Sequence, residues 1–391
     1  MKRTTTTSEY FAWALNICLC SGAPGMFLDV IPEDGILREF DSSQDDKLGT
    51  SLERIAESRV KGFGTVFRVH CGNHTTPDVF YVAVAHAVRM QKEHSSKDSN
   101  EAQEVVPKPQ AGQHVVSFSV PSREIQTNMQ VDSPSPISSQ QLLPQQQQQS
   151  TRKEEKEEKK SSSIISPHIF IVQDIDRAPP RTLECLTEML IMKSLSAPPG
   201  LTNAVVPELL QLPPHFIVIA TSSSLPRAST TTNFLTSPSE GRISDRLMNA
   251  FLLRIPILLP KSSPQFQRIE RLSRNELQTL IEAVPKVYIS PLIIKHVRDT
   301  VSAVRSHPYV ACGLPPRAAD SLCLAIRVQA ALRGSRFAIP QDFTDCVIEA
   351  FAHRFIVAPA EVLPIELTEE DPVFLARWIL AAAVSSLPVI R

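Results

Sequence analysis

Hydrophobic positions follow two different patterns along the chain. Up to about residue 260, short apolar runs of strand length alternate with stretches of helical periodicity. The runs are Ile17 to Cys20, Thr65 to Val69, Ile169 to Val172 and Phe216 to Thr221. Strands that alternate with helices are typical of a parallel sheet with both faces covered. The first part of the chain is therefore predicted to be an α/β domain.

After about residue 260 the strand pattern ends and helical periods take over. Pro340 suits the first turn of a helix, because the N–H that proline lacks has no partner there. The pattern predicts a helical domain at 270–360 and a helical extension at 361–391. The expected helices are Asn275 to Val284, Pro291 to Ser306, Ala318 to Arg333 and Pro340 to Phe355.

Residues 91–163 follow neither pattern and divide the α/β part into segments 10–90 and 164–262. Gln, Ser, Pro, Lys and Glu dominate the interruption, which includes the charge block RKEEKEEKK at 152–160. Such a segment buries too little apolar surface to offset its ordering entropy, so we expect a disordered insertion. His114 to Val120 could form an isolated strand within it. The charge block is either a solvated tail or a docking site for a partner.

Composition narrows the class of protein. The 391 residues, 42% of them hydrophobic, can bury cores for about two domains. Forty basic against 41 acidic residues leave a net charge of −1, so no overall field indicates nucleic acid or an anionic membrane as a partner. The seven cysteines are odd in number and scattered in apolar runs, which favours reduced thiols in an intracellular, cytoplasmic protein.

Two apolar stretches could be mistaken for export or membrane signals. Met1 to Gly25 has a basic start and an apolar stretch, but Asn16 interrupts it. Val373 to Ile390 contains Arg377 and is marginal in length for crossing a bilayer. We interpret the first as a core strand and the second as a buried amphipathic helix, and we expect no membrane association.

The most specific segment is HIFIVQDIDRAPPRTLECLTEML, His168 to Leu190. A buried strand ends at Val172, Asp174 and Asp176 follow, and Arg177-Ala-Pro-Pro leads into a helix. Ligands of parallel sheets bind at the carboxyl ends of strands, where these acids fall. The segment resembles the Walker B region of MoxR-type AAA+ ATPases and of the ATPase subunit I of magnesium chelatase. Those proteins carry a hydrophobic strand, then Asp-Glu-Ile-Asn-Arg-Ala-Pro-Pro, then a helix.

Further segments resemble the same family in the same order, and the whole chain is similar to fungal proteins labelled magnesium chelatase. The resemblance implies an AAA+ P-loop NTPase-like parallel sheet with a C-terminal all-α lid, ATP and magnesium as cofactors, and homo-oligomeric rings with a metal-binding protein partner. The segments are Pro213 to Ser224 (sensor 1 strand), Phe251 to Ile257 (the strand after Leu-Asp-Arg), Gly313 to Phe343 (lid, with Arg317 at the sensor 2 arginine) and Ala352 to Val357 (the closing His-Arg).

The stretch NICLCSGAPGMFLD, residues 16–29, is the expected position of the P-loop. A working loop reads G-x-x-x-x-G-K-[ST], in which backbone N–H groups and the lysine bind the phosphates and the hydroxyl holds magnesium. Gly22 and Gly25 suit such a turn, but Phe27, Leu28 and Asp29 replace the Gly-Lys-Thr. The pattern predicts a degenerate P-loop that binds ATP weakly, with Gly22 and Gly25 as its residual cofactor-binding positions.

Other positions that the family uses for phosphoryl transfer are also changed. Aligned on Arg177-Ala-Pro-Pro, the metal-holding Asp falls on Gln173 and the catalytic Glu on Asp174, although a shifted alignment gives Asp174 the metal role. Asp174 and Asp176 are therefore the candidate catalytic residues of a degenerate Walker B motif. The sensor 1 Asn falls on Ser223, and Leu-Asp-Arg falls on residues 248–250 (Met-Asn-Ala). Phosphoryl transfer depends on such positioning groups.

Two roles are expected for Arg317, either contact with a nucleotide or a structural ion pair with Asp174 or Asp176. The function is open in the same way. The chain is either a scaffold or regulatory subunit with weak or absent hydrolysis, or an active ATPase subunit that couples ATP hydrolysis to metal insertion or client remodelling. A third alternative is an interaction protein that binds its partner through the insertion at 91–163.

Two further groups of residues invite a chemical interpretation. His70, Cys71 and His74 could be metal ligands, but no second ligand pair accompanies them, and a strand end with a turn explains them better. His353 lies among apolar residues, where a hydrogen-bonded core histidine is expected. No metal site is predicted.

Overall fold

The computed structural model describes residues 7–32, 42–61, 64–72, 74–101, 167–198, 209–213, 215–222, 243–259, 272–364 and 372–388. The expected strand at His114 to Val120 and the charge block at 152–160 lie outside the described residues.

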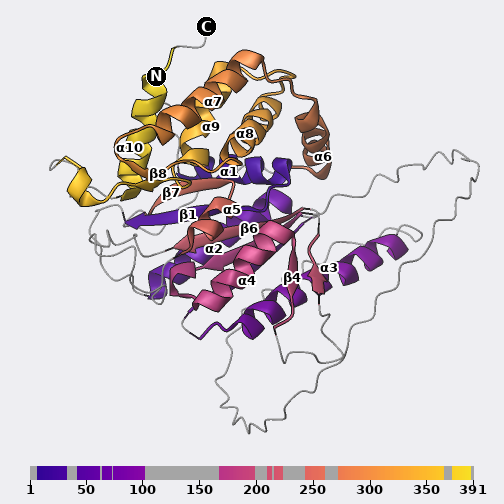
Figure 1. The fold of residues 1–391 in the computed structure, drawn as a ribbon. Helices are drawn as coiled ribbons and strands as arrows, with labels where there is room; N and C mark the ends of the chain where they lie inside the picture. Colours follow the sequence, from indigo (N-terminus) through magenta and orange to yellow (C-terminus); the bar gives the residue numbers. More distant parts are fainter. Residues whose placement is uncertain are drawn as a thin grey trace, which may run out of the picture. The chain divides into compact units, whose positions relative to one another are not determined.

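Five parallel strands form the central sheet, in the order β2-β3-β6-β1-β7 (Figure 1). The predicted strands at Thr65 to Val69, Ile169 to Val172 and Phe216 to Thr221 are confirmed as β2, β3 and β6, and the strand resembling the one after Leu-Asp-Arg is confirmed as β7. The strands are β1 (Gly25–Pro32), β2 (Thr65–His70), β3 (His168–Gln173), β6 (Phe216–Ser222) and β7 (Leu253–Leu259).

Helices cover both faces of the sheet, so the strands are mainly apolar. Ile169 and Ile171 of β3 pack in the cluster that contains α1 and α2. Phe170 and Val172 pack in the opposite cluster, with α3, α4 and α5. This alternation of faces is the two-residue period of a strand buried on both sides. The helices are α1 (Thr7–Ser21), α2 (Ser42–Val60), α3 (Pro77–Glu101), α4 (Pro180–Met192) and α5 (Asp245–Ala250).

The C-terminal part is helical, as predicted. Ser273 caps α6 in a reciprocal capping box with Glu276, and Ser290 caps α7 with Pro291 in its first turn. Two short antiparallel pairs complete the described structure, β4 (Ser194–Ser196) with β5 (Leu209–Gln211) and β8 (Val310–Cys312) with β9 (Ile356–Val357). The helical elements are α6 (Arg274–Ala283), η2 (Val284–Lys286), α7 (Pro291–Arg305), α8 (Ala318–Leu332), α9 (Pro340–Phe351), η3 (Ala360–Val362) and α10 (Pro372–Ser385).

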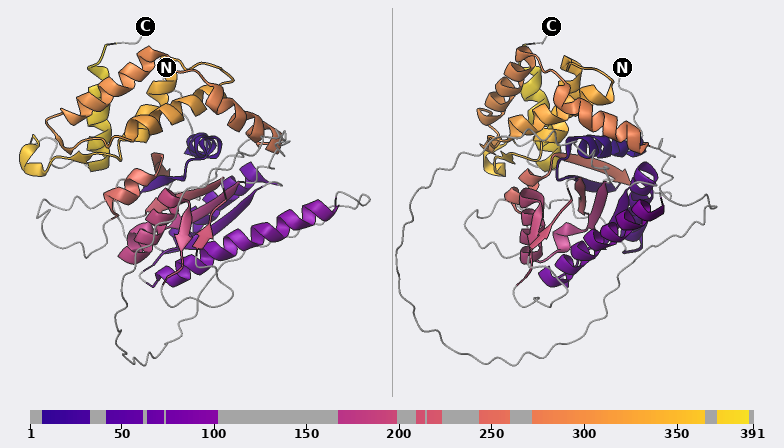
Figure 2. Two further views of the ribbon diagram at one scale, coloured as in Figure 1. Left: turned by 45° about the vertical axis from the view of Figure 1, so that its right-hand side comes forward. Right: turned by 90° about the vertical axis from the view of Figure 1, so that its right-hand side faces the viewer.

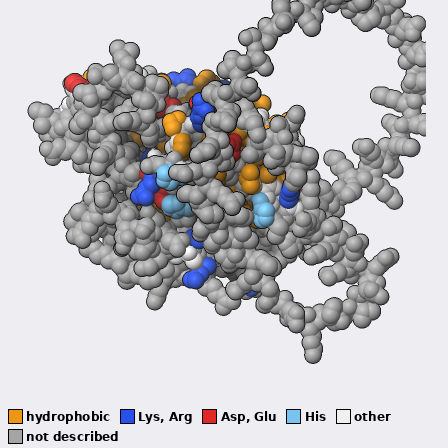
Figure 3. All heavy atoms as spheres, turned by 90° about the horizontal axis from the view of Figure 1, so that it is seen from below, with side chains coloured by type: hydrophobic (Ala, Val, Ile, Leu, Met, Phe, Trp, Pro, Cys, Tyr) orange, Lys and Arg blue, Asp and Glu red, His pale blue; other side chains and the backbone are white. Residues whose placement is uncertain are grey.

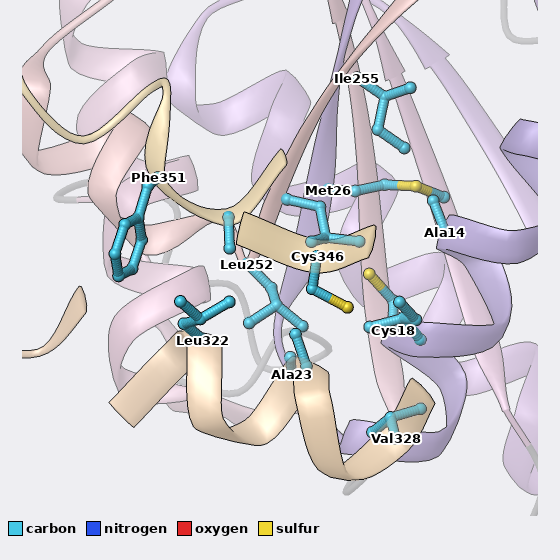
Figure 4. Packing of buried hydrophobic residues seen from close by; sticks show 14 of the residues in the cluster. Ala14, Cys18, Ala23, Met26, Leu252, Ile255, Leu322, Val328, Cys346 and Phe351 are labelled. Carbon is cyan, nitrogen blue, oxygen red and sulfur yellow. The ribbon is translucent and has the colours of Figure 1, made fainter. Parts of the chain in front are cut away.

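The predicted strand at Ile17 to Cys20 is wrong, because these residues lie in helix α1. Helix α1 is wedged between the sheet and the lid, where Ala14 and Cys18 meet Met26 of the sheet and Val328 of α8 (Figure 4). A helix buried on several sides has no polar face. Its short apolar run therefore looks like a buried strand in the sequence.

The expected boundary of the insertion at residue 91 is also wrong, because α3 continues to Glu101 (Figure 2). The C-terminal half of this helix is polar, and a polar helical segment has the same composition as a disordered one. Composition alone therefore put the boundary too early. Across the described ranges, no helix is both long and apolar enough to cross a bilayer.

Candidate functional site

Polar residues meet where β2, β3 and β6 end. His70 lies opposite Gln173 in the parallel register of β2 and β3. The Cys71 N–H donates to the Gln173 carbonyl at 2.9 Å, and the Asp174 N–H donates to Thr221 Oγ1 at 3.3 Å. Three strand ends are therefore bound together at the edge of the sheet where parallel α/β proteins bind their ligands.

A histidine–aspartate pair occupies this edge. His70 Nε2 lies 2.7 Å from Asp174 Oδ2, and the side chain of Asp174 is 3% exposed while that of His70 is 54% exposed. Asp174 adopts a left-handed conformation (φ 52°, ψ 47°), which aspartate tolerates better than most residues. The turn brings the Asp174 carboxylate within ion-pair distance of the His70 imidazole. The structure thus pairs Asp174 with His70, which the sequence placed at a strand end with a turn in preference to a metal site.

Cys71 lies buried beside this pair and is chemically quiet. Burial, with the negative charges of Asp174 and Asp176 nearby, raises the pKa of the Cys71 thiol to about 12. The thiol is therefore protonated at neutral pH, which makes it a poor nucleophile. Within the described part of the chain, no three His, Cys, Asp or Glu side chains are grouped closely enough to hold a metal ion.

Gln173, at the expected position of the metal-holding Asp, is buried against helix α2. A Cβ atom added to Gly49 of α2 would lie 2.1 Å from Gln173 Nε2. The carboxamide therefore packs directly on the backbone of the helix. This end of β3 presents a neutral side chain rather than a carboxylate.

The expected placement of the P-loop at Gly22 and Gly25 is wrong. A P-loop connects a strand to a following helix, whereas these glycines connect helix α1 to strand β1. Gly22 has a φ of +61° and ends α1, and its carbonyl accepts a hydrogen bond from Lys193 Nζ at 3.2 Å. A Cβ atom on Gly25 would lie 2.1 Å from the Val218 carbonyl oxygen. The structure therefore explains both glycines without a phosphate site: Gly22 by its positive φ, and Gly25 by its close approach to β6.

The strand-to-helix connection at this place in the fold is residues 33–41, between β1 and α2. These residues lie outside the described ranges, and their sequence is EDGILREFD. Gly35 is the only glycine, four residues are acidic, Arg38 is basic, and there is no lysine, serine or threonine. The lysine that a P-loop uses to bind phosphate is therefore absent from this segment, and the nearest hydroxyl side chains are Ser42 and Ser43 at the start of α2.

Phe27, Leu28 and Asp29 lie within strand β1 and not in a loop. Phe27 packs edge-on against Phe251, with ring centroids 5.7 Å apart. Asp29 is buried and bonded to Arg254 of β7, with Nε to Oδ2 at 2.7 Å and Nη2 to Oδ1 at 2.8 Å. Sequence reasoning missed this pair. The sequence did contain a signal for it, because Asp29 and Arg254 are the single charged residues of two otherwise apolar strands.

Arg317 takes neither of its two expected structural partners. It stands at the N-cap position of α8 with an exposed side chain, and within the described ranges that side chain makes no hydrogen bond or ion pair. The expected ion pair with Asp174 or Asp176 is therefore wrong. The expected sensor 1 position, Ser223, lies outside the described residues.

The lid is attached to the α/β part by His353 and Arg354 instead. Arg354 donates through Nη2 to the Phe251 carbonyl at 2.7 Å and through Nη1 to the Asn249 carbonyl at 3.3 Å. His353 Nε2 lies 3.2 Å from the same Phe251 oxygen, which confirms it as a hydrogen-bonded core histidine. Burial lowers the pKa of His353 well below its usual value and that of Arg354 to about 10.

Comparison with known proteins agrees with this architecture. Residues 302–373 match a family model described as an AAA lid domain. A crystal structure of a proposed ATPase from Cytophaga hutchinsonii superposes with a TM-score of 0.55 at 14% sequence identity, covering 99% of this chain and 92% of that one. No curated protein matches the sequence. The strand order, the lid and this structural likeness together show that the chain has the AAA+ fold, an α/β parallel-sheet core followed by a helical lid.

Proposed function

We propose that this protein is an AAA+-fold scaffold or regulatory subunit that has lost tight triphosphate binding. The observation that carries the proposal is the connection between β1 and α2. With four acidic residues and one basic residue, segment 33–41 has a formal charge of −3. A segment with net negative charge and no lysine repels a polyphosphate, whereas the lysine of a P-loop attracts one.

The absence of the lysine sets a lower limit on the loss of ATP affinity. Loss of a charge-assisted contact costs about 1.5–3 kcal/mol, which corresponds to about one to two decades in affinity. Repulsion from the acidic segment adds to that loss. We therefore expect at most weak binding of ATP through this connection.

The end of strand β3 supports the same proposal. Gln173 offers a neutral amide instead of a carboxylate, and it packs against Gly49 of α2. Asp174 already has His70 as a partner at 2.7 Å. A hydrated magnesium ion between β3 and α2 would have to displace both contacts, and magnesium gives up its waters reluctantly.

The alternative is an active ATPase subunit of the MoxR or magnesium chelatase type, assembled in a ring and coupling hydrolysis to metal insertion or client remodelling. The acidic residues Asp174 and Asp176 at the end of β3 favour it, because they stand where such enzymes hold metal and water. Under this alternative, Asp174 would leave His70 when nucleotide binds.

Titration of the purified full chain with a fluorescent ATP analogue separates the two. With magnesium present, the proposal predicts no saturable binding up to millimolar analogue, while an authentic AAA+ ATPase run in parallel saturates. Micromolar, magnesium-dependent binding would reject the proposal. Asp174→Asn should then abolish the magnesium dependence if Asp174 is the ligand, whereas the exposed Arg177→Gln serves as a matched surface change.

A further inference from the structure

Helix α10 is apolar on two sides, and only one of them is packed. The helix contacts α7, α9 and β9. On the opposite side, Phe374 and Trp378 are 57% and 42% exposed although both are large and aromatic. A helix that is apolar all round is normally buried, and exposed apolar faces mark contact sites. The packed side comprises Leu375, Ala376, Ile379, Leu380 and Ala383.

The exposed side of α10, here termed the α10 stripe, has a large half and a small half. Phe374 and Trp378 form the half nearer the start of the helix. Ala381, Ala382 and Ser385, which are also exposed, form the half nearer its end. At 3.6 residues per turn, these five residues fall within about 100° of the helix circumference. They therefore make one continuous stripe, with two aromatic rings at one end and only small side chains at the other.

The α10 stripe carries no charge. Arg377 is the only charged residue of the helix, and Glu349 of α9 binds it through two hydrogen bonds of 2.6 and 2.5 Å. A two-fold contact places a surface against a copy of itself, so charges on that surface meet like charges and repel them. The α10 stripe is free of this repulsion, and its electrostatic match is another uncharged surface.

Two other surfaces with exposed apolar side chains do carry charge. Tyr288 and Phe337 of the lid are 62% and 59% exposed, and the exposed Lys286 and Arg336 are their neighbours along the chain. On the face of the molecule seen from below, Lys, Arg and His side chains lie among the hydrophobic ones (Figure 3). Pairing of either surface with its own copy would bring like charges together.

We propose that two copies of this chain pair through their α10 stripes, with the two helices antiparallel about a two-fold axis. Phe374 of one copy then lies over Ser385 of the other, and Trp378 lies over Ala381. Both pairings are symmetric about the same point of the helix, between Ile379 and Leu380, so one axis satisfies them together. Each copy thus places its two rings on the small half of its partner, in the way that large and small side chains interdigitate between packed helices.

The pairing is closed and weak. Both copies use the same surface, so a dimer has no free copy of it left. The contact needs no nucleotide and is independent of the function proposed above. Helix α10 has 14 residues and is therefore about 21 Å long. One face of such a helix is smaller than the roughly 800 Å² per partner of a standard interface, and we expect a dissociation constant on the order of 10 μM.

Sedimentation velocity of the full chain tests the pairing. The wild type should convert from monomer to dimer between about 1 and about 300 μM and form nothing larger. Phe374→Ser with Trp378→Ser, the ring variant, removes both aromatic anchors and should weaken dimerisation at least about tenfold. Ala381→Arg with Ser385→Arg, the filled variant, occupies the small half and should weaken it as strongly. All four residues are exposed, so unchanged circular dichroism and melting temperature check the fold.

A mixture of the two variants tests the two-fold geometry. In the mixed pair, the intact rings of the filled variant meet the intact small half of the ring variant. The introduced arginines face positions from which the rings have been removed. The mixture should therefore dimerise more tightly than either variant alone. Val82→Arg, which adds a charge at an exposed position of α3, is the matched control and should dimerise like the wild type.

Four results would overturn the proposal. They are a wild type that stays monomeric at about 300 μM, wild-type species that grow beyond the dimer, variants that dimerise as tightly as the wild type, and a mixture no tighter than its components. A lipid surface is the rival occupant, because Phe and Trp also insert at bilayer interfaces. Monomeric wild type that sediments with phosphatidylcholine vesicles, when the ring variant does not, would assign the α10 stripe to lipid.

Discussion

Arg254 of strand β7 holds Asp29 of strand β1 in a two-point contact, with Nε to Oδ2 at 2.7 Å and Nη2 to Oδ1 at 2.8 Å. The guanidinium carbon also lies 5.3 Å from the centroid of the Phe27 ring, next to the carboxylate it binds. Planar, two-point pairing suits arginine in particular. The Asp29 carboxylate, which stands in place of the P-loop threonine in the expected alignment, is thus neutralised within the sheet.

Replacement of Arg254 should therefore destabilise the fold. Arg254→Leu leaves the buried Asp29 charge without its partner, which should lower the free energy of unfolding by about 3 kcal/mol. Urea denaturation followed by circular dichroism measures this loss. Arg254→Lys keeps the charge but not the two-point geometry. Its free energy of unfolding should therefore lie between those of the wild type and Arg254→Leu. The double replacement of Asp29 and Arg254 by Leu should recover most of the loss; if it does not, the pair is not the cause.

The two glycines at the start of β1 should respond differently to alanine. Gly25→Ala places a Cβ atom against the Val218 backbone oxygen of β6, so the sheet must shift, and we expect a loss of more than about 3 kcal/mol. Gly22→Ala has open space but a φ of +61°, which should cost only about 1–2 kcal/mol.

Thermal unfolding ranks these variants. Gly72→Ala, which has open space and no positive φ, is the matched control and should behave as the wild type. A Gly25→Ala protein of normal stability but weakened nucleotide binding would return the phosphate site to residues 22–29.

Arg354 should couple the lid to the α/β part. Arg354→Leu removes charged hydrogen bonds to the Phe251 and Asn249 carbonyls and should cost about 2–3 kcal/mol. Hydrogen exchange should accelerate first in α5 and α9, the elements that the guanidinium joins. Arg317→Leu is the matched control, because that exposed arginine has no partner within the described ranges, and it should stay within about 0.5 kcal/mol of the wild type. Equal exchange rates in both variants would contradict the coupling.

Acid should destabilise the protein through His168. Burial, aided by nearby His215, lowers the pKa of His168 from 6.5 to about 4. Between these values the unfolded chain binds the proton and the folded one does not, so stability is complete above about pH 6.5 and falls as the pH approaches 4. The shift corresponds to on the order of 3 kcal/mol.

Urea denaturation at a series of pH values measures this dependence. His168→Gln should flatten the slope between pH 6.5 and 4 relative to the wild type, whatever its stability at neutral pH. His215 and His353, whose pKa values are also lowered by burial, should leave a residual slope in both proteins. An unchanged slope in the variant would mean that His168 is already accessible to protons in the fold.

Helices α6 and α7 of the lid were predictable because each has a polar face and local end signals. Ser273 with Glu276, and Ser290 with Pro291, mark helix starts that need no tertiary partner. Strands β2, β3 and β6 were predictable because each is a short apolar run between helices. Helix α1 was not, since contacts on several of its sides removed the amphipathic period that identifies a helix.

The sequence by itself determined the division into an α/β part and a helical lid, because this division depends on side-chain type and local periodicity. Only the tertiary structure decided where the strand-to-helix connection falls, that His70 faces Asp174, that Asp29 is paired with Arg254, and that Gln173 packs on Gly49. Each of these contacts joins residues from different elements. Their partners are set by sheet order and packing, which no local pattern encodes.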